Sequence, residues 1–106
     1  VDTFAGADLW QEGIITKTPE DMVLRKRWFD DVEILRQNTS YAAKWLAKSG
    51  TKNPYREGPL GVIQEGAYAD ILLVDGNPVD DVTVMADWKN NIKVIIKDGE
   101  IYKNAM

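Results

Sequence analysis

The side chains of this sequence that could carry chemistry are mainly carboxylates, because two residue types that are common in active sites are absent. The chain contains no histidine and no cysteine. Hydrolytic zinc sites rest mainly on imidazole ligands, and serine or cysteine nucleophiles usually need an imidazole base. The chain therefore cannot build either site from its own residues. Carboxylate chemistry remains open, either as a Mg²⁺ or Ca²⁺ site or as an acid and base pair.

Two pairs of adjacent aspartates are the candidates for an acid and base pair. Asp30-Asp31 precedes the run Val32-Glu33-Ile34-Leu35, and Asp80-Asp81 follows Asn77-Pro78. Adjacent carboxylates at a helix start usually accept hydrogen bonds from its free N–H groups. We interpret both pairs as caps, and a small acidic enzyme with paired carboxylates stays an alternative.

The elements that would position these groups begin with two helix starts. Thr18-Pro19 is followed by two acids, as is typical of a first helical turn, and we expect this helix to reach about Trp28. Asp30 and Glu33 form a capping-box pattern that predicts a second helix.

A third helix is predicted directly after the second. Thr39 is its expected cap, and Gly50 is its expected C-terminal stop. Its small residues Ala42 and Ala43 would allow a close approach to a neighbouring helix.

The second half of the chain predicts a sheet of three or four strands. Ile71–Val74 is a short apolar run between turn residues, which indicates a strand buried on both faces. Residues 92–97 alternate as a strand with one wetter face. Asp98-Gly99 then predicts a tight hairpin to Glu100–Lys103. Together these elements predict an α+β fold.

The length, charge and composition of the chain limit the kinds of molecule that we expect it to bind. The chain has 106 residues, a net charge of -4 and a pI of about 4.7, which makes a nucleic-acid partner unfavourable on electrostatic grounds. We find no signal peptide and no apolar run of the ~20 residues that a membrane span needs. The cytoplasm is the default expectation for its location.

The N-terminus suggests a segment of a longer protein. The first residue is valine, and Val1–Ala5 is a β-prone run that starts without a turn. A chain that opens within a strand looks cut, so we expect preceding sequence.

Several short pieces, in this order and spacing, resemble the C-terminal end of the amidohydrolase superfamily. They are Gly61, the Glu65-Gly66 turn, Ala69-Asp70, Asp75–Pro78 and Lys97–Gly99. The chain is most similar to the imidazolonepropionase-like and Xaa-Pro dipeptidase-like (prolidase-like) branch. The resemblance covers nearly the whole chain.

The resemblance implies how the α+β chain divides. Residues 1–58 would supply the last strand, the active-site loop and three helices of a TIM-like (β/α)8 barrel. Residues 59–106 would form the C-terminal portion of a composite β-sandwich. The missing strands of that sandwich would come from sequence before Val1.

The resemblance also implies one catalytic residue, Asp8. In the family the eighth barrel strand ends in a Gly-Thr-Asp-like tripeptide, whose aspartate is a metal ligand and accepts the proton of the hydrolytic water. Gly6 and Asp8 match this tripeptide, whereas Ala7 departs from the usual threonine or serine. The parent protein would use zinc or another divalent metal, and the upstream barrel would supply the histidine ligands. We expect no metal on the isolated chain.

The implied function is that of a C-terminal fragment of a metal-dependent amidohydrolase. The parent would hydrolyse C–N bonds of a peptide-like or cyclic amide substrate, and this fragment would be inactive alone. The alternative is a non-catalytic, stand-alone structural or binding module of the same ancestry. The expected partner is the remainder of the same enzyme. Without it we expect exposed apolar edges and self-association.

Overall fold

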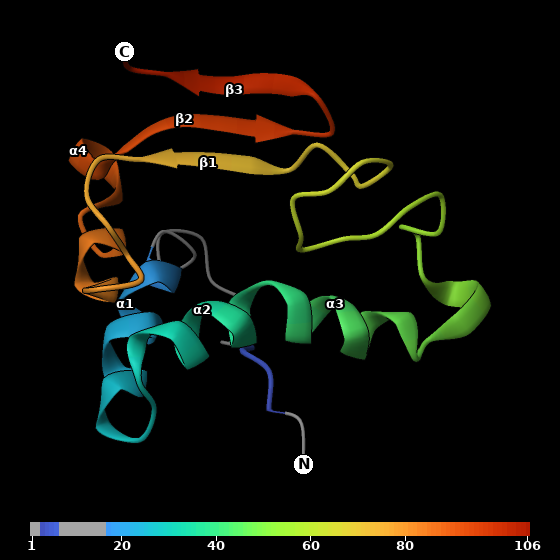
Figure 1. Cartoon of the computed structure of the whole chain (residues 1–106), viewed down its shortest axis with the longest axis horizontal. Coiled ribbons are helices and arrows are strands. Elements are labelled where there is room, and N and C mark those ends of the chain that lie inside the picture. The colour runs from blue at the N-terminus through green and yellow to red at the C-terminus, as the bar shows by residue number, and fades with distance from the viewer. Residues whose placement is uncertain (1–2, 7–16) are drawn as a thin grey trace.

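A computed structural model describes residues 3–6 and 17–106 of the chain. Helices α2 and α3 run along one side of the molecule and a three-stranded sheet along the other, with α1, η4 and α4 joining them at one end (Figure 1). The elements in chain order are α1 (Thr18–Leu24), the 3₁₀ helix η2 (Arg25–Arg27), α2 (Asp31–Asn38), α3 (Ser40–Ala47), the 3₁₀ helix η3 (Gly50–Lys52), β1 (Ile71–Val74), the 3₁₀ helix η4 (Val82–Met85), α4 (Trp88–Asn91), β2 (Ile92–Lys97) and β3 (Glu100–Asn104).

The predicted helices are present, with one change in how they are capped. The Asp30 side chain accepts a hydrogen bond from the backbone N–H of Glu33 at 2.8 Å, which confirms the predicted cap of α2. Thr39 precedes α3 but makes no side-chain cap. Its hydroxyl donates instead to the Leu35 carbonyl at 2.7 Å, because the junction is tight enough for Thr39 to satisfy an end of α2.

The sheet has the order β1-β2-β3, and both pairs are antiparallel. Asp98 and Gly99 both have positive φ, 50° and 81°, the geometry of a type I′ turn. The predicted hairpin is therefore confirmed. Among the described residues no fourth strand forms, and Ile63, in the loop before β1, is exposed.

Strand β1 lies at an edge of the sheet, so the prediction of burial on both faces is wrong for this chain. Leu72 and Leu73 are each 47% exposed. The apolar run correctly predicted a strand, but burial depends on which other elements cover it. No described residue pairs with the free edge of β1 or covers both of its faces.

The expected strand at Val1–Ala5 is also not formed in its described part. Residues 3–6 belong to no helix or strand. A strand needs a neighbour for its ladder of hydrogen bonds, and the described residues provide none beside this segment.

The hydrophobic core lies where α1 and α2 pack against η4 and the start of β2. Ile34 of α2 and Val82 of η4 are fully buried, and partly buried apolar residues pack around the cluster that they belong to. The other buried members of this core are Met22, Met85 and Ile92. Core residues thus come from both sides of residue 58, and the division into 1–58 and 59–106 stays a prediction. Within the described part of the chain, no helix has the length and apolar character needed to cross a bilayer.

Asp70 ties the start of β1 to the β2–β3 hairpin. Its carboxylate accepts from Lys97 Nζ at 2.8 and 3.0 Å and from the Asp98 backbone N–H at 2.8 Å. The Lys97 hydrogen bond, followed by that of Asp98, lowers the pKa of Asp70. The same contact raises the pKa of Lys97. Both effects favour the ionised pair in the folded chain.

Gly61 provides a test of close backbone packing. Its φ is +75°, and a Cβ there would lie 2.6 Å from the Thr39 carbonyl oxygen, whereas Gly66 has φ +81° and open space. Each change to alanine costs about 1–2 kcal/mol for the left-handed conformation. Gly61→Ala should lower the free energy of unfolding further, because the loop must move off the α2–α3 junction. Urea unfolding of both variants measures the difference, and equal losses would contradict the packing.

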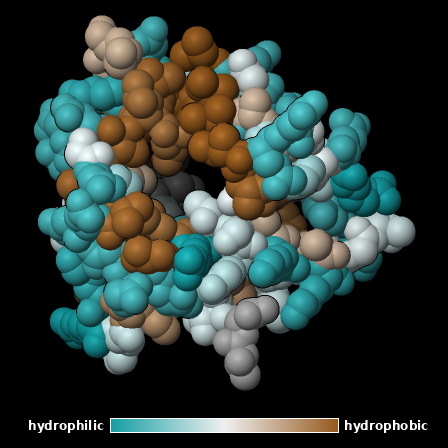
Figure 2. All heavy atoms as spheres, viewed as in Figure 1, coloured by the Kyte–Doolittle hydropathy of each residue, from teal (hydrophilic) through white to brown (hydrophobic). Residues whose placement is uncertain are grey.

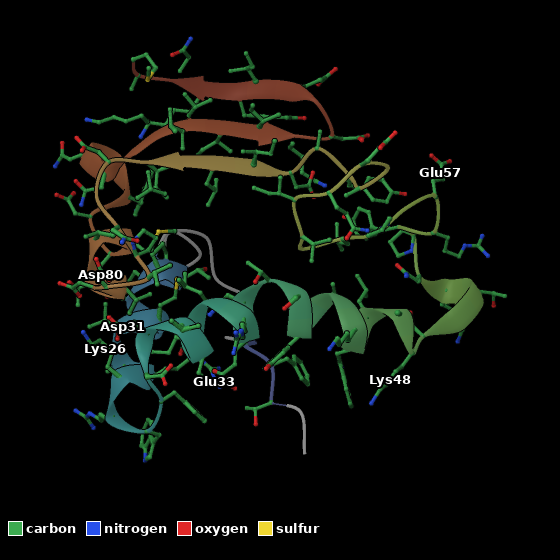
Figure 3. The ribbon with its side chains drawn as sticks, viewed as in Figure 1. Lys26, Asp31, Glu33, Lys48, Glu57 and Asp80 are labelled. Atoms are coloured by element: carbon green, nitrogen blue, oxygen red, sulfur yellow. The ribbon has the colours of Figure 1, made fainter. Side chains whose placement is uncertain are left out.

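The Asp70 contact predicts a pH dependence of stability. A lowered folded pKa stabilises the native state above the unfolded value of about 4, and this contribution is lost as the pH falls through the folded pKa. Asp70→Asn should therefore lower the urea midpoint at pH 7 and have less effect near pH 3. Glu57→Gln is the matched control, since Glu57 points away from the body of the molecule (Figure 3). A deficit of the same size at both pH values would refute the ionic contribution.

Candidate functional site

Asp8, the predicted catalytic residue, lies outside the described residues. The structure describes the segment just before it, residues 3–6, and the elements that hold this segment. The backbone N–H of Ala5 donates to the Gln37 carbonyl at the end of α2 at 3.0 Å. The Phe4 ring stacks on Trp45 of α3, with centroids 4.6 Å apart and planes 17° from parallel. The approach to Asp8 is thus attached to the α2–α3 unit at two points.

Gln37 is a buried polar residue that the sequence analysis missed. It is fully buried, and its side-chain Oε1 accepts from the Arg25 guanidinium at 3.2 Å. Its Nε2 has no acceptor among residues 3–6 and 17–106. An unsatisfied buried donor costs about 1–3 kcal/mol. A sequence signal was available, since Gln37 lies one helical turn from Ile34, on the buried face of α2.

The first acidic pair does not form an acid and base site. Asp30 caps α2, and Asp31 accepts from the Val82 backbone N–H at 2.9 Å. Asp31 also lies 3.5 Å from Lys26 Nζ, and Figure 3 shows the two residues near one end of the molecule. Asp30 thus caps its own helix, and Asp31 connects α2 to η4 and to Lys26.

The second acidic pair is likewise structural. Asp80 accepts from the Asn77 amide at 2.8 Å. Asp81 caps η4 by accepting from the Thr83 backbone N–H and hydroxyl, and it pairs with Lys26 at 3.3 Å. The Thr83 bonds, followed by that of Lys26, lower the pKa of Asp81. The bond to Asp81 in turn raises the pKa of Lys26.

These shifts weaken the alternative of a carboxylate enzyme. A general acid or base works best with a pKa near the operating pH, which requires the pKa of a carboxyl group to rise. The pKa of Asp81 moves the other way. In the described part of the chain, no group of three or more His, Cys, Asp or Glu side chains is arranged to hold a metal ion.

An apolar groove of about 650 Å³ lies between the sheet and α3. Its walls include Leu46 of α3, Val62 and Ile63 of the connecting loop, and Ile71 and Leu72 of β1. Figure 2 shows hydrophobic side chains gathered around a hollow in the middle of the molecule. Its polar lining includes Tyr55, Asp70 and Lys97, and the last two form an ion pair at 2.8 Å. The groove runs beside β1, the edge strand of the sheet.

Comparison with known proteins identifies the family. No protein-family model and no curated protein matches the chain. Among solved structures, a crystal structure of an amidohydrolase matches 98% of the chain with a TM-score of 0.80 and 28% identity. A structure of an uncharacterized protein matches 93%, with a TM-score of 0.74 and 29% identity. A prolidase in complex with N-methylphosphonate-L-proline matches 95%, with a TM-score of 0.76 and 30% identity.

The match is nearly complete for this chain and partial for its neighbours. The chain covers 23% of the amidohydrolase, and 22% of each of the other two structures. Its helices, its sheet and their arrangement are therefore those of one part of a larger amidohydrolase structure. The sequence resemblance and the structural match agree, and the chain belongs to the amidohydrolase superfamily.

Proposed function

We propose that the chain is the C-terminal portion of a metal-dependent amidohydrolase that hydrolyses C–N bonds and that it is inactive alone. The observation that carries the proposal is the match of almost the whole chain to about a fifth of an amidohydrolase and of a prolidase. The proposed substrate class is a peptide-like or cyclic amide, and the prolidase neighbour and the sequence resemblance support it. Such an enzyme would need the chain to be joined to a larger remainder.

In this proposal the two parts of the chain belong to different bodies of the enzyme. Residues 1–58 contribute the last strand and helices of a TIM-like barrel, and residues 59–106 contribute to a β-sandwich. The extended segment at residues 3–6 would become a barrel strand once neighbouring strands supply its hydrogen bonds. The edge strand β1 would gain the cover that it lacks here.

The described residues do not by themselves fit a catalytic metal. They contain no suitable cluster of ligands, and the whole sequence has no histidine. A bound divalent ion would lower the pKa of a water molecule and polarise the substrate carbonyl. The histidine ligands must then come from the remainder of the enzyme, and Asp8 is the carboxylate that we assign from this chain to that centre, as ligand and proton acceptor.

The remainder of the enzyme is also the partner that the exposed surface favours. Ile63 is 88% exposed, and Leu72 and Leu73 of β1 are each 47% exposed. Exposed apolar side chains beside a groove and a free strand edge are typical of a surface that another protein covers. We therefore propose that the remainder covers the groove and the edge of β1, and that the isolated chain self-associates.

The alternative, a non-catalytic module, predicts a different upstream gene sequence and no hydrolytic activity. A catalytic parent requires an upstream reading frame that encodes a barrel with a His-x-His pair, whereas a stand-alone module does not. Sequencing upstream of the codon for Val1 distinguishes the two. An upstream reading frame that does not encode such a barrel would contradict the catalytic proposal.

Asp8→Asn in the complete protein tests the catalytic assignment. Loss of the carboxylate should lower kcat for a proline dipeptide or cyclic amide by about 10²–10⁴-fold, the range expected for a positioned proton acceptor. Asp80→Asn is the control and should leave kcat unchanged, because the Asp80 carboxylate accepts an exposed hydrogen bond from Asn77. Steady-state hydrolysis with zinc or another divalent ion supplies the measurement. Wild-type kcat in Asp8→Asn would refute the role of Asp8.

A further inference from the structure

A second hollow, of about 370 Å³, lies at the end of the sheet opposite α4, where the β2–β3 turn meets the loop before β1 (Figure 1). Aromatic and charged side chains line it: Tyr55, Tyr68, Lys97, Asp98, Glu100 and Tyr102. Nothing in the proposed hydrolytic function uses this hollow, which we call the tyrosine pocket.

Two of the rings in the tyrosine pocket are held in a fixed arrangement. The rings of Tyr55 and Tyr68 meet edge to face, with centroids 5.6 Å apart and planes at 87°. The Tyr68 hydroxyl also accepts from the Glu57 backbone N–H at 3.3 Å. Tyr102 of β3, which is 68% exposed, brings a third ring to the pocket. Aromatic faces attract cations, and groups that are already ordered lose little freedom when a ligand binds.

The charged side chains of the tyrosine pocket make it negative. Lys97 is neutralised by Asp70, whose carboxylate lies 2.8 Å from Lys97 Nζ. In the described part of the chain, neither Asp98 nor Glu100 forms an ion pair with a lysine or arginine. A ligand that carries positive charge is therefore favoured over a neutral or negative one.

One ring of the tyrosine pocket already contacts an ammonium group. Lys97 Nζ lies 4.9 Å from the centroid of the Tyr55 ring. No lysine of the described residues lies over the rings of Tyr68 or Tyr102 in the same way. These two rings are the ones that remain for a second cation.

We propose that the tyrosine pocket binds a small organic ammonium ion. The rings of Tyr68 and Tyr102 contact the alkyl groups around the charged nitrogen, and the carboxylates of Asp98 and Glu100 balance its charge. An inorganic ion fits less well, because no group of three or more His, Cys, Asp or Glu side chains in the described residues could hold one. The inference does not depend on hydrolysis and requires only that the pocket stays open in the complete protein.

Saturation-transfer NMR of tetramethylammonium with the complete protein tests the proposal. tert-Butanol, a neutral molecule of similar shape, is the control for apolar contact alone. Sodium chloride keeps the ionic strength constant during the titration, because salt screens exposed charges. The dissociation constant is measured for the wild type and for each variant.

Two exposed residues of the pocket supply matched variants. Tyr102→Leu should weaken binding about two- to fivefold, the loss expected for one exposed ring, whereas Tyr102→Phe keeps the ring and should bind as the wild type does. Asp98→Asn should weaken binding by a similar factor, and asparagine tolerates the positive φ of 50° at this position. Trp28→Leu and Glu20→Gln, which remove an exposed ring and an exposed carboxylate on or beside α1, should leave binding unchanged.

The proposal is supported if the wild type binds tetramethylammonium but not tert-butanol, and if Tyr102→Leu and Asp98→Asn bind more weakly than the control variants. Absence of saturation transfer in the wild type, or equal transfer to tert-butanol, would overturn it. Wild-type affinity in Tyr102→Leu and Asp98→Asn would show that the ion binds elsewhere, which overturns the site as well.

Discussion

The contact between Ile34 and the η4 turn holds the two halves of this chain together. Ile34 and Val82 are fully buried, and they come from the helical and the sheet-forming parts of the sequence. The Asp31 carboxylate accepts from the Val82 backbone N–H, and Lys26 lies against both Asp31 and Asp81. Because the sheet meets the helices mainly at this end, the position of β1 relative to α3 depends on this small cluster. The groove lies between α3 and β1, where the described residues form no buried cluster that joins the helices to the sheet.

This arrangement explains how a chain can be well folded locally and still leave apolar surface uncovered. Five buried apolar residues of the described part of the chain form a small core, whereas Leu72, Leu73 and Ile101 of the sheet stay exposed. An apolar edge strand is normally protected, because its free hydrogen-bonding groups invite pairing. The chain matches only about a fifth of larger amidohydrolase structures, and in the function we propose the cover would come from the remainder of the enzyme. The proposed role of Asp8 has the same requirement, because the sequence contains no histidine.

Local features of this fold could be predicted from sequence, and distant ones could not. The Asp30 cap and the Asp98-Gly99 hairpin involve only residues a few positions apart, so a short sequence pattern is enough to predict them. The burial of β1 was predicted wrongly, because it depends on elements elsewhere. The bond between Asp31 and Val82 joins residues 51 positions apart, which no short pattern encodes. For the site, the resemblance supplied Asp8, whereas the contacts of Trp45 required the structure.

Hydrogen exchange of β1 and α3, in the isolated chain and in the complete enzyme, tests most directly whether this chain is one part of a larger hydrolase. We predict rapid exchange of the outward-facing amides of Ile71–Val74 in the dilute isolated chain, because no described strand pairs with that edge. In the complete enzyme these amides should be strongly protected, together with those of α3 beside the groove. Equal exchange in the two proteins would contradict the account, since the remainder would then leave this surface uncovered.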